Sequence, residues 1–130
     1  MDIQIGKSKT VTTKVDKTNT ALAVGSGGLE VFGTPMMIAL MEKSAYKVLE
    51  GCLGEGQTSV GISLNIEHTS ASPLGADISA TATITAVDGR KVSFDLIASD
   101  NKGTIGKGTH ERFVIDSEKF MNKVKEKATK

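Results

Sequence analysis

The spacing of apolar residues separates the chain into a stretch with helical period and several stretches with strand period. From residue 57 onward, apolar and polar residues alternate, which is typical of strands with one buried face. The apolar positions of these runs are Val60, Ile62, Leu64 and Ile66, then Ala76, Ile78, Ala80, Ala82, Ile84 and Ala86, then Val92, Phe94, Leu96 and Ala98. Asp88-Gly89 and the DNKG segment at 100–103 are turn signals after the second and third runs. We therefore expect three or four long, consecutive antiparallel strands.

The helical period covers residues 35–50. Thr34 is the expected N-cap, Pro35 suits the first helical position because it needs no N–H donor there, and Gly51 is expected to end the helix in a left-handed conformation. The first half of the helix, MMIALM, is apolar all round. Such a helix is predicted to be central, with burial on most of its sides.

One long apolar helix followed by a strongly curved antiparallel sheet is typical of the hotdog fold, an α+β arrangement in which the sheet wraps around the helix. A small β-barrel around a helix is the alternative. Residues 10–24, rich in Thr and Val, are expected to be extended, and residues 116–130 to form a short amphipathic helix. The length predicts a single domain over 1–130, with 1–9 and 125–130 frayed.

Composition excludes several classes of partner. Sixteen Lys and Arg against fifteen Asp and Glu leave a net charge of +1, and aromatic residues make up 4% with no Trp. Because this composition provides neither a basic surface nor a stacking platform, no nucleic acid is expected as a partner. No apolar run approaches the ~18–20 residues of a membrane span, and the first residues lack the pattern of a secretory signal. We expect a cytoplasmic protein without a membrane partner.

Glu42 is the most informative single residue. On a helix, its neighbours three and four positions away are Ile38, Ala39, Ala45 and Tyr46. It therefore lies on an apolar stripe and not on the lysine-rich face. On such a stripe a carboxylate is suited to act as a base, an acid or a nucleophile. The alternative is that Glu42 lies at the edge of the stripe and pairs with Lys43 or Lys47 of a neighbouring chain.

His68 and Gly61 lie in the first strand run. His68 continues the alternation that begins at Val60, so it is expected to point to the core face, as a ligand-facing group or as a structural histidine. Gly61 stands between the apolar positions of this run, so it is expected on the opposite face of the strand. It either lets a ligand approach its N–H closely or marks a bulge or a close crossing with the helix.

Other polar residues give weaker signals. The hydroxyl of Thr34, at a helix N-terminus, also suits an oxyanion or a carboxylate. His110 and Arg112 share one face of the last strand, where His110 is expected to be solvated and Arg112 could pair with a phosphate or a carboxylate. Two histidines with scattered carboxylates do not make a metal-site spacing. Cys52, the only cysteine, excludes internal disulfides and multi-cysteine metal sites, and no histidine stands at a spacing that would make it catalytic.

Four segments, in unbroken order, resemble the fluoroacetyl-CoA thioesterase-like branch of the hotdog superfamily. They are VFGTPMMIALMEKSAY, SVGISLNIEHTSASPLG, VDGRKVSFDLIASD and GKGTHERFVI, and the resemblance runs from about Ala21 to Ile115. The positions that match the functional positions of that branch are Thr34, Glu42, Gly61, His68 and Arg112.

The resemblance implies hydrolysis of a small acyl-CoA thioester by a homodimer, with no metal and no organic cofactor. Glu42 would attack the thioester carbonyl or activate water, and His68 would be the general acid and base. Thr34 would orient that carboxylate or the substrate. The N–H of Gly61 would lie close to the carbonyl oxygen, and Arg112 would lie toward the CoA side.

A hotdog enzyme of this branch can carry an aromatic lid that discriminates among acyl groups, and Phe32, near the start of the helix, is the residue placed for such a gate. A chain of 130 residues has one core and little room for a deep pocket. We therefore expect a pocket between two copies, with the helix of Glu42 from one chain and the strand edge of His68 from the other. Two other functions stay open: a non-catalytic module that binds acyl-CoA or a small ligand, and a hotdog hydratase or dehydratase.

Overall fold

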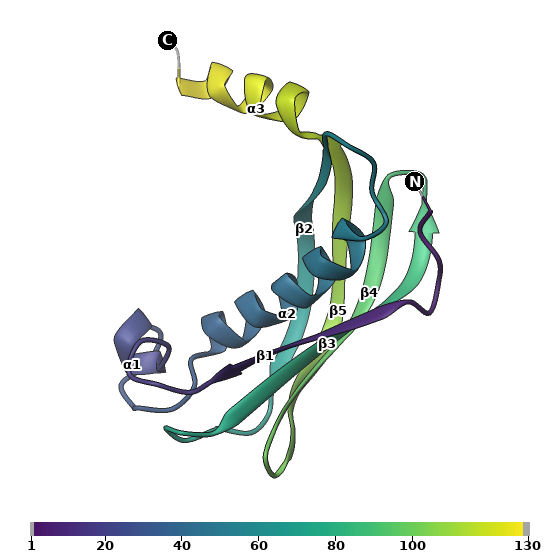
Figure 1. The fold of residues 1–130 in the computed structure, drawn as a ribbon. Helices are drawn as coiled ribbons and strands as arrows, with labels where there is room; N and C mark the ends of the chain where they lie inside the picture. Colours follow the sequence, from purple (N-terminus) through teal and green to yellow (C-terminus); the bar gives the residue numbers. More distant parts are fainter. Residues whose placement is uncertain (1, 129–130) are drawn as a thin grey trace.

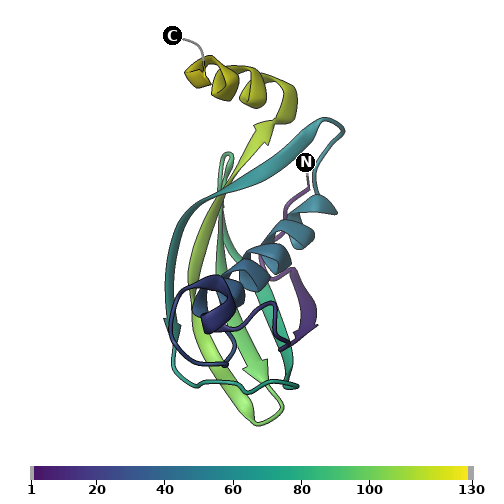
Figure 2. The same cartoon turned by 90° about the vertical axis from the view of Figure 1, so that its left-hand side faces the viewer.

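The computed structural model describes residues 2–128 as one antiparallel sheet with a long helix against one face (Figure 1). The strands are β1 (Ser8–Lys14), β2 (Gln57–His68), β3 (Asp77–Asp88), β4 (Lys91–Asp100) and β5 (Gly103–Asp116). The helices are α1 (Ala21–Val24), α2 (Thr34–Glu50) and α3 (Ser117–Lys125), followed by a 3₁₀ turn at Glu126–Ala128. The strand order is β1-β3-β4-β5-β2, and the sheet curves around α2 (Figure 2). The curved sheet around one long helix confirms the α+β architecture predicted from the sequence.

Helix α2 has the predicted extent, but both of its ends differ from the prediction. Gly33 is the N-cap and Thr34 is already the first helical residue, so the predicted capping role of Thr34 is wrong. A side chain at position 33 would meet the backbone N of Ala21 at 3.2 Å, and the close passage of α1 therefore favours glycine there. Gly51 has φ −73° and ψ −8°, so the predicted left-handed ending is also wrong. The N–H of Cys52 bonds to the carbonyl of Leu49 instead, at 2.7 Å.

The core lies between α2 and the concave face of the sheet. The helix contributes Met37, Leu40, Met41, Ala45, Val48 and Leu49, and β4 contributes Val92, Phe94, Leu96 and Ala98, as its alternation predicts. In β3 the predicted positions are buried as far as Ile84, whereas Ala86 is exposed because the register with β4 shifts between these two residues.

One face of α2 is open in the single chain. Thr34 and Ala39 are exposed, and Ile38 and Glu42 are partly exposed. In the apolar first half, MMIALM, Met37, Leu40 and Met41 are buried and Ala39 is exposed. The predicted burial on most sides therefore holds except along this face.

Strand β2 forms one edge of the sheet and contains a β-bulge. Its register with β5 shifts between Gly61 and Ser63, so one extra residue is inserted into β2 at this point. Two apolar side chains beside the bulge stay open, since Ile62 is 51% exposed and Leu64 is 41% exposed. The edge strand thus presents an apolar surface that the chain does not cover itself.

The flanking segments follow the prediction only in part. Within the expected extended segment 10–24, strand β1 ends at Lys14, and Ala21–Val24 form the short helix α1, whose first turn is capped by the Thr20 hydroxyl. Strand β1 begins at Ser8, inside the stretch 1–9 for which fraying is expected. Helix α3 forms as predicted and extends away from the sheet (Figure 1). The last residues of the expected frayed end, 129–130, lie outside the described residues.

Within the described residues 2–128, no helix is both long enough and apolar enough to cross a membrane. The same residues contain no group of three or more His, Cys, Asp and Glu side chains that could hold a metal ion.

Candidate active site

The start of α2 lies beside the end of β2, and this places Thr34 against His68. Because Gly33 serves as the N-cap, the Thr34 hydroxyl is free for another contact, and it lies 2.7 Å from Nδ1 of His68. The other ring nitrogen, Nε2, is buried and has no hydrogen-bond partner within the described part of the chain. The imidazole is therefore oriented through one nitrogen, while the second is available for proton transfer.

Glu42 lies about two turns further along α2, beside Gly61. A Cβ at Gly61 would lie only 2.8 Å from Oε2 of Glu42, so the absent side chain is what makes room for the carboxylate. The same oxygen is 3.8 Å from Nη1 of Arg112. The Glu42 side chain is 39% exposed, so its own chain does not enclose it. Within the chain, the cation beside Glu42 is Arg112 of β5. The alternative considered from the sequence, pairing with Lys43 or Lys47, involves a second chain and stays a prediction.

Arg112 is held in place on several sides and is only 6% exposed. Its Nε donates to the Ser59 hydroxyl at 2.8 Å and its Nη2 donates to the Ser59 carbonyl at 3.0 Å. Nη1 lies 3.2 Å from Nε2 of His110, and the guanidinium lies 5.9 Å from the centre of the Tyr46 ring. Burial lowers the pKa of Arg112, while Glu42 and Tyr46 oppose that shift. The result is a fixed, buried cation that faces the Glu42 carboxylate.

His110 is not solvated, and the sequence-based prediction for it is wrong. It is 1% exposed, its Nδ1 lies 2.8 Å from the carbonyl of Ser63, and its ring stacks on Phe94 with the centroids 5.8 Å apart. In the β4–β5 register His110 lies directly opposite Phe94, and cross-strand partners share a face. The apolar pattern of β4 was therefore a signal for His110, but it could be used only once the register was known.

The bulge in β2 explains how two positions of opposite parity face the same helix. Without it, Gly61 and His68 would lie on opposite faces, because side chains alternate along a strand. The extra residue between Gly61 and Ser63 reverses the alternation, so Gly61 lies beside Glu42 of α2 and His68 reaches Thr34 of α2. The bulge thus aligns the site.

The structure brings the predicted residues together as two groups rather than one. The first group is Thr34 with His68, and the second is Glu42 with Gly61 and Arg112. Glu42 is eight positions after Thr34, which corresponds to about 12 Å along a helix axis. The first group holds the imidazole and the second holds the carboxylate, and neither group holds both.

Phe32 and Cys52 are both buried. Phe32 is 1% exposed and belongs to the core next to the start of α2, so its ring packs inside the chain; its role as an acyl gate stays a prediction. Cys52 donates its thiol to the Val48 carbonyl at 3.3 Å. The predicted contact of Arg112 with CoA stays a prediction; the guanidinium contacts Ser59 and His110.

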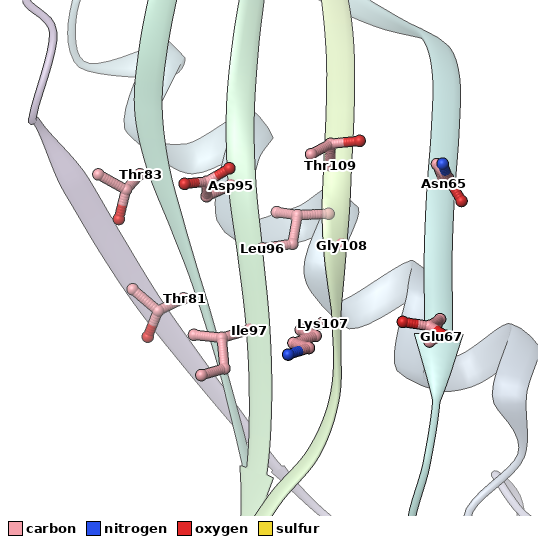
Figure 3. Close-up of a pocket in the computed structure, with 10 residues that line it drawn as sticks. All are labelled: Asn65, Glu67, Thr81, Thr83, Asp95, Leu96, Ile97, Lys107, Gly108 and Thr109. Carbon is pink, nitrogen blue, oxygen red and sulfur yellow. The ribbon is translucent and has the colours of Figure 1, made fainter.

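A hollow of about 710 Å³ lies over the face of the sheet opposite to α2 (Figure 3). It is lined by Asn65, Glu67, Thr81, Thr83, Asp95, Leu96, Ile97, Lys107, Gly108 and Thr109. None of the predicted site residues is among them. The hollow is therefore separate from both groups on α2.

Comparison with known proteins decides the family. The model of the fluoroacetyl-CoA-specific thioesterase family matches residues 15–118 of the chain, a span that contains both groups. The chain belongs to this family. It is accordingly a thioester hydrolase of the hotdog fold, and the predicted fold and enzyme class are confirmed.

Individual members of the family and of the wider fold agree with this assignment. The fluoroacetyl-CoA thioesterase of Streptantibioticus cattleyicolor is 41% identical over 98 residues, which cover 75% of this chain and 70% of that protein. A solved structure of the fluoroacetyl-CoA thioesterase FlK is 33% identical and superposes with a TM-score of 0.91 over 98% of both chains. A hot-dog-like protein from Thermanaerovibrio acidaminovorans is 27% identical, with a TM-score of 0.86 over 95% of this chain and 91% of the other.

Proposed function

We propose that the chain hydrolyses small acyl-CoA thioesters at a site shared by two copies. The observation that carries the proposal is the state of His68. One nitrogen of its ring is fixed by the Thr34 hydroxyl, and the other is buried and unpaired at the open end of the sheet. A buried polar atom without a partner is costly in a folded protein, so it is a place where a reacting group is expected to bind.

A homodimer would join the two groups. The open face of α2 carries the apolar Ile38 beside the carboxylate of Glu42, and the edge strand β2 exposes Ile62 and Leu64. Such open apolar side chains are suited to contact with a second copy. If two α2 helices lie antiparallel across a two-fold axis, the Thr34 end of one faces Glu42 of the other. A two-fold contact is reciprocal, so one dimer would contain two complete sites.

In such a site the two groups divide the chemistry of hydrolysis. If Glu42 removes a proton from water, the water oxygen attacks the thioester carbonyl, and breaking of the C–S bond releases the acid and the thiol. If Glu42 itself attacks, breaking of the C–S bond releases the thiol and leaves an acyl anhydride on Glu42, which water then hydrolyses to release the acid. The Thr34 hydroxyl can donate to Nδ1 of His68 or accept from it. His68 can therefore take up a proton at Nε2 and later give it to the leaving sulfur. The Gly61 N–H, beside the bulge, is the proposed donor to the carbonyl oxygen.

Arg112 contributes to this site through charge. Its buried guanidinium faces Glu42 at 3.8 Å, which favours the ionised carboxylate that either role requires. The predicted contact with CoA remains part of the proposal, as does Phe32 as a residue that limits the acyl group. None of these steps uses a metal or an organic cofactor, and a cytoplasmic location, where we expect the enzyme to act, stays a prediction.

The decisive experiment follows thiol release from a panel of acyl-CoAs that differ in chain length and polarity. The wild type is expected to release CoA from short acyl groups, and Glu42→Ala is expected to lose activity by about 10²–10⁴-fold. Glu50→Ala is the matched control, because Glu50 lies on the same helix, is exposed and forms an ion pair with Lys47 at 3.4 Å. Glu42→Ala with nearly wild-type activity across the panel would contradict the catalytic assignment.

The same panel separates the two other functions left open by the sequence. Tight binding of CoA esters with no thiol released over hours would indicate a binding module. Turnover of 3-hydroxyacyl or enoyl substrates without thiol release would indicate a hydratase or dehydratase. Family membership and the arrangement of Thr34 with His68 both favour hydrolysis.

A further inference from the structure

The buried pair His110 and Arg112 is the strongest feature that the proposed steps leave unexplained. A histidine that is 1% exposed in the core of a sheet loses its solvation, and burial accordingly lowers the pKa of His110. An apolar side chain could stack on Phe94 as well without that cost. The two ring nitrogens of His110 therefore need an explanation in terms of what they contact.

The contacts of His110 fix its tautomer. A guanidinium only donates hydrogen bonds, so Nη1 of Arg112, 3.2 Å away, must donate to a bare Nε2. The proton of the neutral ring is then on Nδ1, which donates to the carbonyl of Ser63 at 2.8 Å. The ring thus links Ser63, at the far side of the bulge, to Arg112.

The same link reaches Glu42. Of the two hydrogens on Nη1 of Arg112, one is directed to His110, and the nitrogen lies 3.8 Å from Oε2 of Glu42. The space beside Gly61 shows how closely these groups approach each other, because a Cβ there would lie 2.8 Å from Oε2 of Glu42, 3.2 Å from Cε1 of His110 and 3.4 Å from Nη1 of Arg112. A small rotation of the guanidinium would therefore move the carboxylate.

We propose that His110 is a positioning residue for hydrolysis, whose neutral ring holds the Arg112 guanidinium in the orientation that keeps the Glu42 carboxylate beside Gly61. This inference rests on the proposed function, in which Glu42 acts on the thioester. His110 does not touch the substrate; it acts through Arg112, and through Ser63 it ties that arginine to the bulge that aligns the strand.

Two variants distinguish the hydrogen bond that Nε2 of His110 accepts from Arg112 from the one that Nδ1 donates to Ser63. In His110→Gln the side-chain carbonyl can reach the place of Nε2 and accept from Arg112. In His110→Asn the shorter amide can donate to the Ser63 carbonyl but does not reach Arg112. We expect kcat of the Asn variant to fall about tenfold or more with KM little changed, and the Gln variant to recover most of that loss.

The activities of the two variants are compared on folded protein, and urea unfolding checks that both variants are folded. Equal activity of the Asn and Gln variants, whether both high or both low, overturns the proposal, because the acceptor then makes no difference. A loss of activity that only follows the loss of folded protein overturns it as well.

A second measurement uses the wild type and needs no activity. In protein labelled with ¹⁵N at histidine, NMR distinguishes a protonated from a bare ring nitrogen. We expect Nδ1 of His110 to be protonated and Nε2 to be bare near neutral pH. The opposite tautomer overturns the proposal, because two donors would then face each other. A wild type that cleaves no acyl-CoA contradicts the proposed function, whereas the tautomer decides separately whether His110 holds Arg112.

Discussion

The two groups on α2 differ in how far their hydrogen bonds are satisfied. Around Arg112, each guanidinium nitrogen has a partner within the chain, and the cation is 6% exposed. Around His68, one ring nitrogen bonds to Thr34 and the other has no partner among the described residues. Helix α2 thus contacts a satisfied cation on β5 through Glu42 and an imidazole with one unpaired nitrogen on β2 through Thr34. A shared site needs both.

The largest expected effect comes from two substitutions, one in each group, that are placed in different chains. His68→Ala and Glu42→Ala are each expected to lose activity by roughly 10²–10⁴-fold, because each removes a group that handles protons or attacks the substrate. Mixed, unfolded and refolded together, the two inactive variants should recover about a quarter of wild-type activity, since half of the random dimers contain one intact site. Thiol release measures the recovery.

The control for this mixture pairs Glu42→Ala with the double variant that also carries His68→Ala. No dimer of these chains contains an intact shared site, so no recovery is expected. If the first mixture also shows no recovery, each site is built within one chain. The two groups of different chains then do not form a shared site.

A smaller effect is expected from changing the cation in the satisfied group. Lysine in Arg112→Lys keeps the charge but cannot donate to Ser59 twice and to His110 at once. Losing one such charged hydrogen bond costs about 1.5–3 kcal/mol, so we expect both a lower urea midpoint and a fall in kcat/KM of roughly ten- to hundredfold. Arg90→Lys, at the β3–β4 turn, is the control for a general effect of the exchange.

Gly61→Ala is expected to alter activity without a matching loss of stability. The new methyl would lie 2.8 Å from Oε2 of Glu42, which is the end of a flexible side chain and can move away. It would also lie 3.2 Å from Cε1 of His110, which must shift by only a few tenths of an ångström. We expect a loss in kcat of about tenfold, while the free energy of unfolding changes by less than about 1 kcal/mol. Gly28→Ala is the control, because a Cβ there meets nothing within 4 Å. A variant with full activity would show that the placement of the carboxylate is not critical.

The smallest predicted effect is on the pH dependence of stability. Burial lowers the pKa of His110, with the Arg112 charge acting in the same direction and the Ser63 carbonyl, Glu42 and Glu111 opposing it. Below an ordinary value of about 6.5, the unfolded chain takes up a proton at this residue that the folded chain does not. As the pH decreases below this value, the free energy of unfolding should therefore decrease, by at most about 1.4 kcal/mol for each pH unit, until the lowered pKa is reached.

Urea unfolding of the wild type and of His110→Gln at pH 7.5 and 5.5 measures this contribution. The wild type is expected to lose more stability than the variant between these two values, because the glutamine does not titrate. An equal loss in both proteins would show that the protonation of His110 is not linked to folding.

The alternation along the chain was sufficient to predict the elements that pack regularly. The positions from Val92 to Ala98 are buried as expected, and α2 begins and ends within a residue of the prediction. These successes share a cause: in regular helices and strands, the period of the sequence is the period of the structure. The choice of Glu42, His68 and Gly61 as unusual residues used the same patterns.

The failures lie where tertiary contacts decide. A bulge at Gly61 was one of the alternatives that the sequence left open, and it forms directly after this residue, but the sequence does not show that it changes which residues of β2 face α2. The burial of His110 depends on its register with Phe94, and the cap at Gly33 depends on the close passage of α1. The face of α2 that carries Ile38 and Ala39 stays partly open, although its apolar residues predicted burial. Such features follow from neighbours in space, which one sequence does not list.

The order of the strands also has a kinetic consequence. Strands β3, β4 and β5 are consecutive and pair through short turns, whereas residues 57–68 of β2 pair with residues 106–116 of β5 after the whole meander between them. Closing the larger loop has the greater entropic cost, so β2 is expected to dock late in folding. The contacts of Gly61 with Glu42 and of His68 with Thr34 form only at that step. On refolding, a chain with most of its sheet already in place would still lack its site.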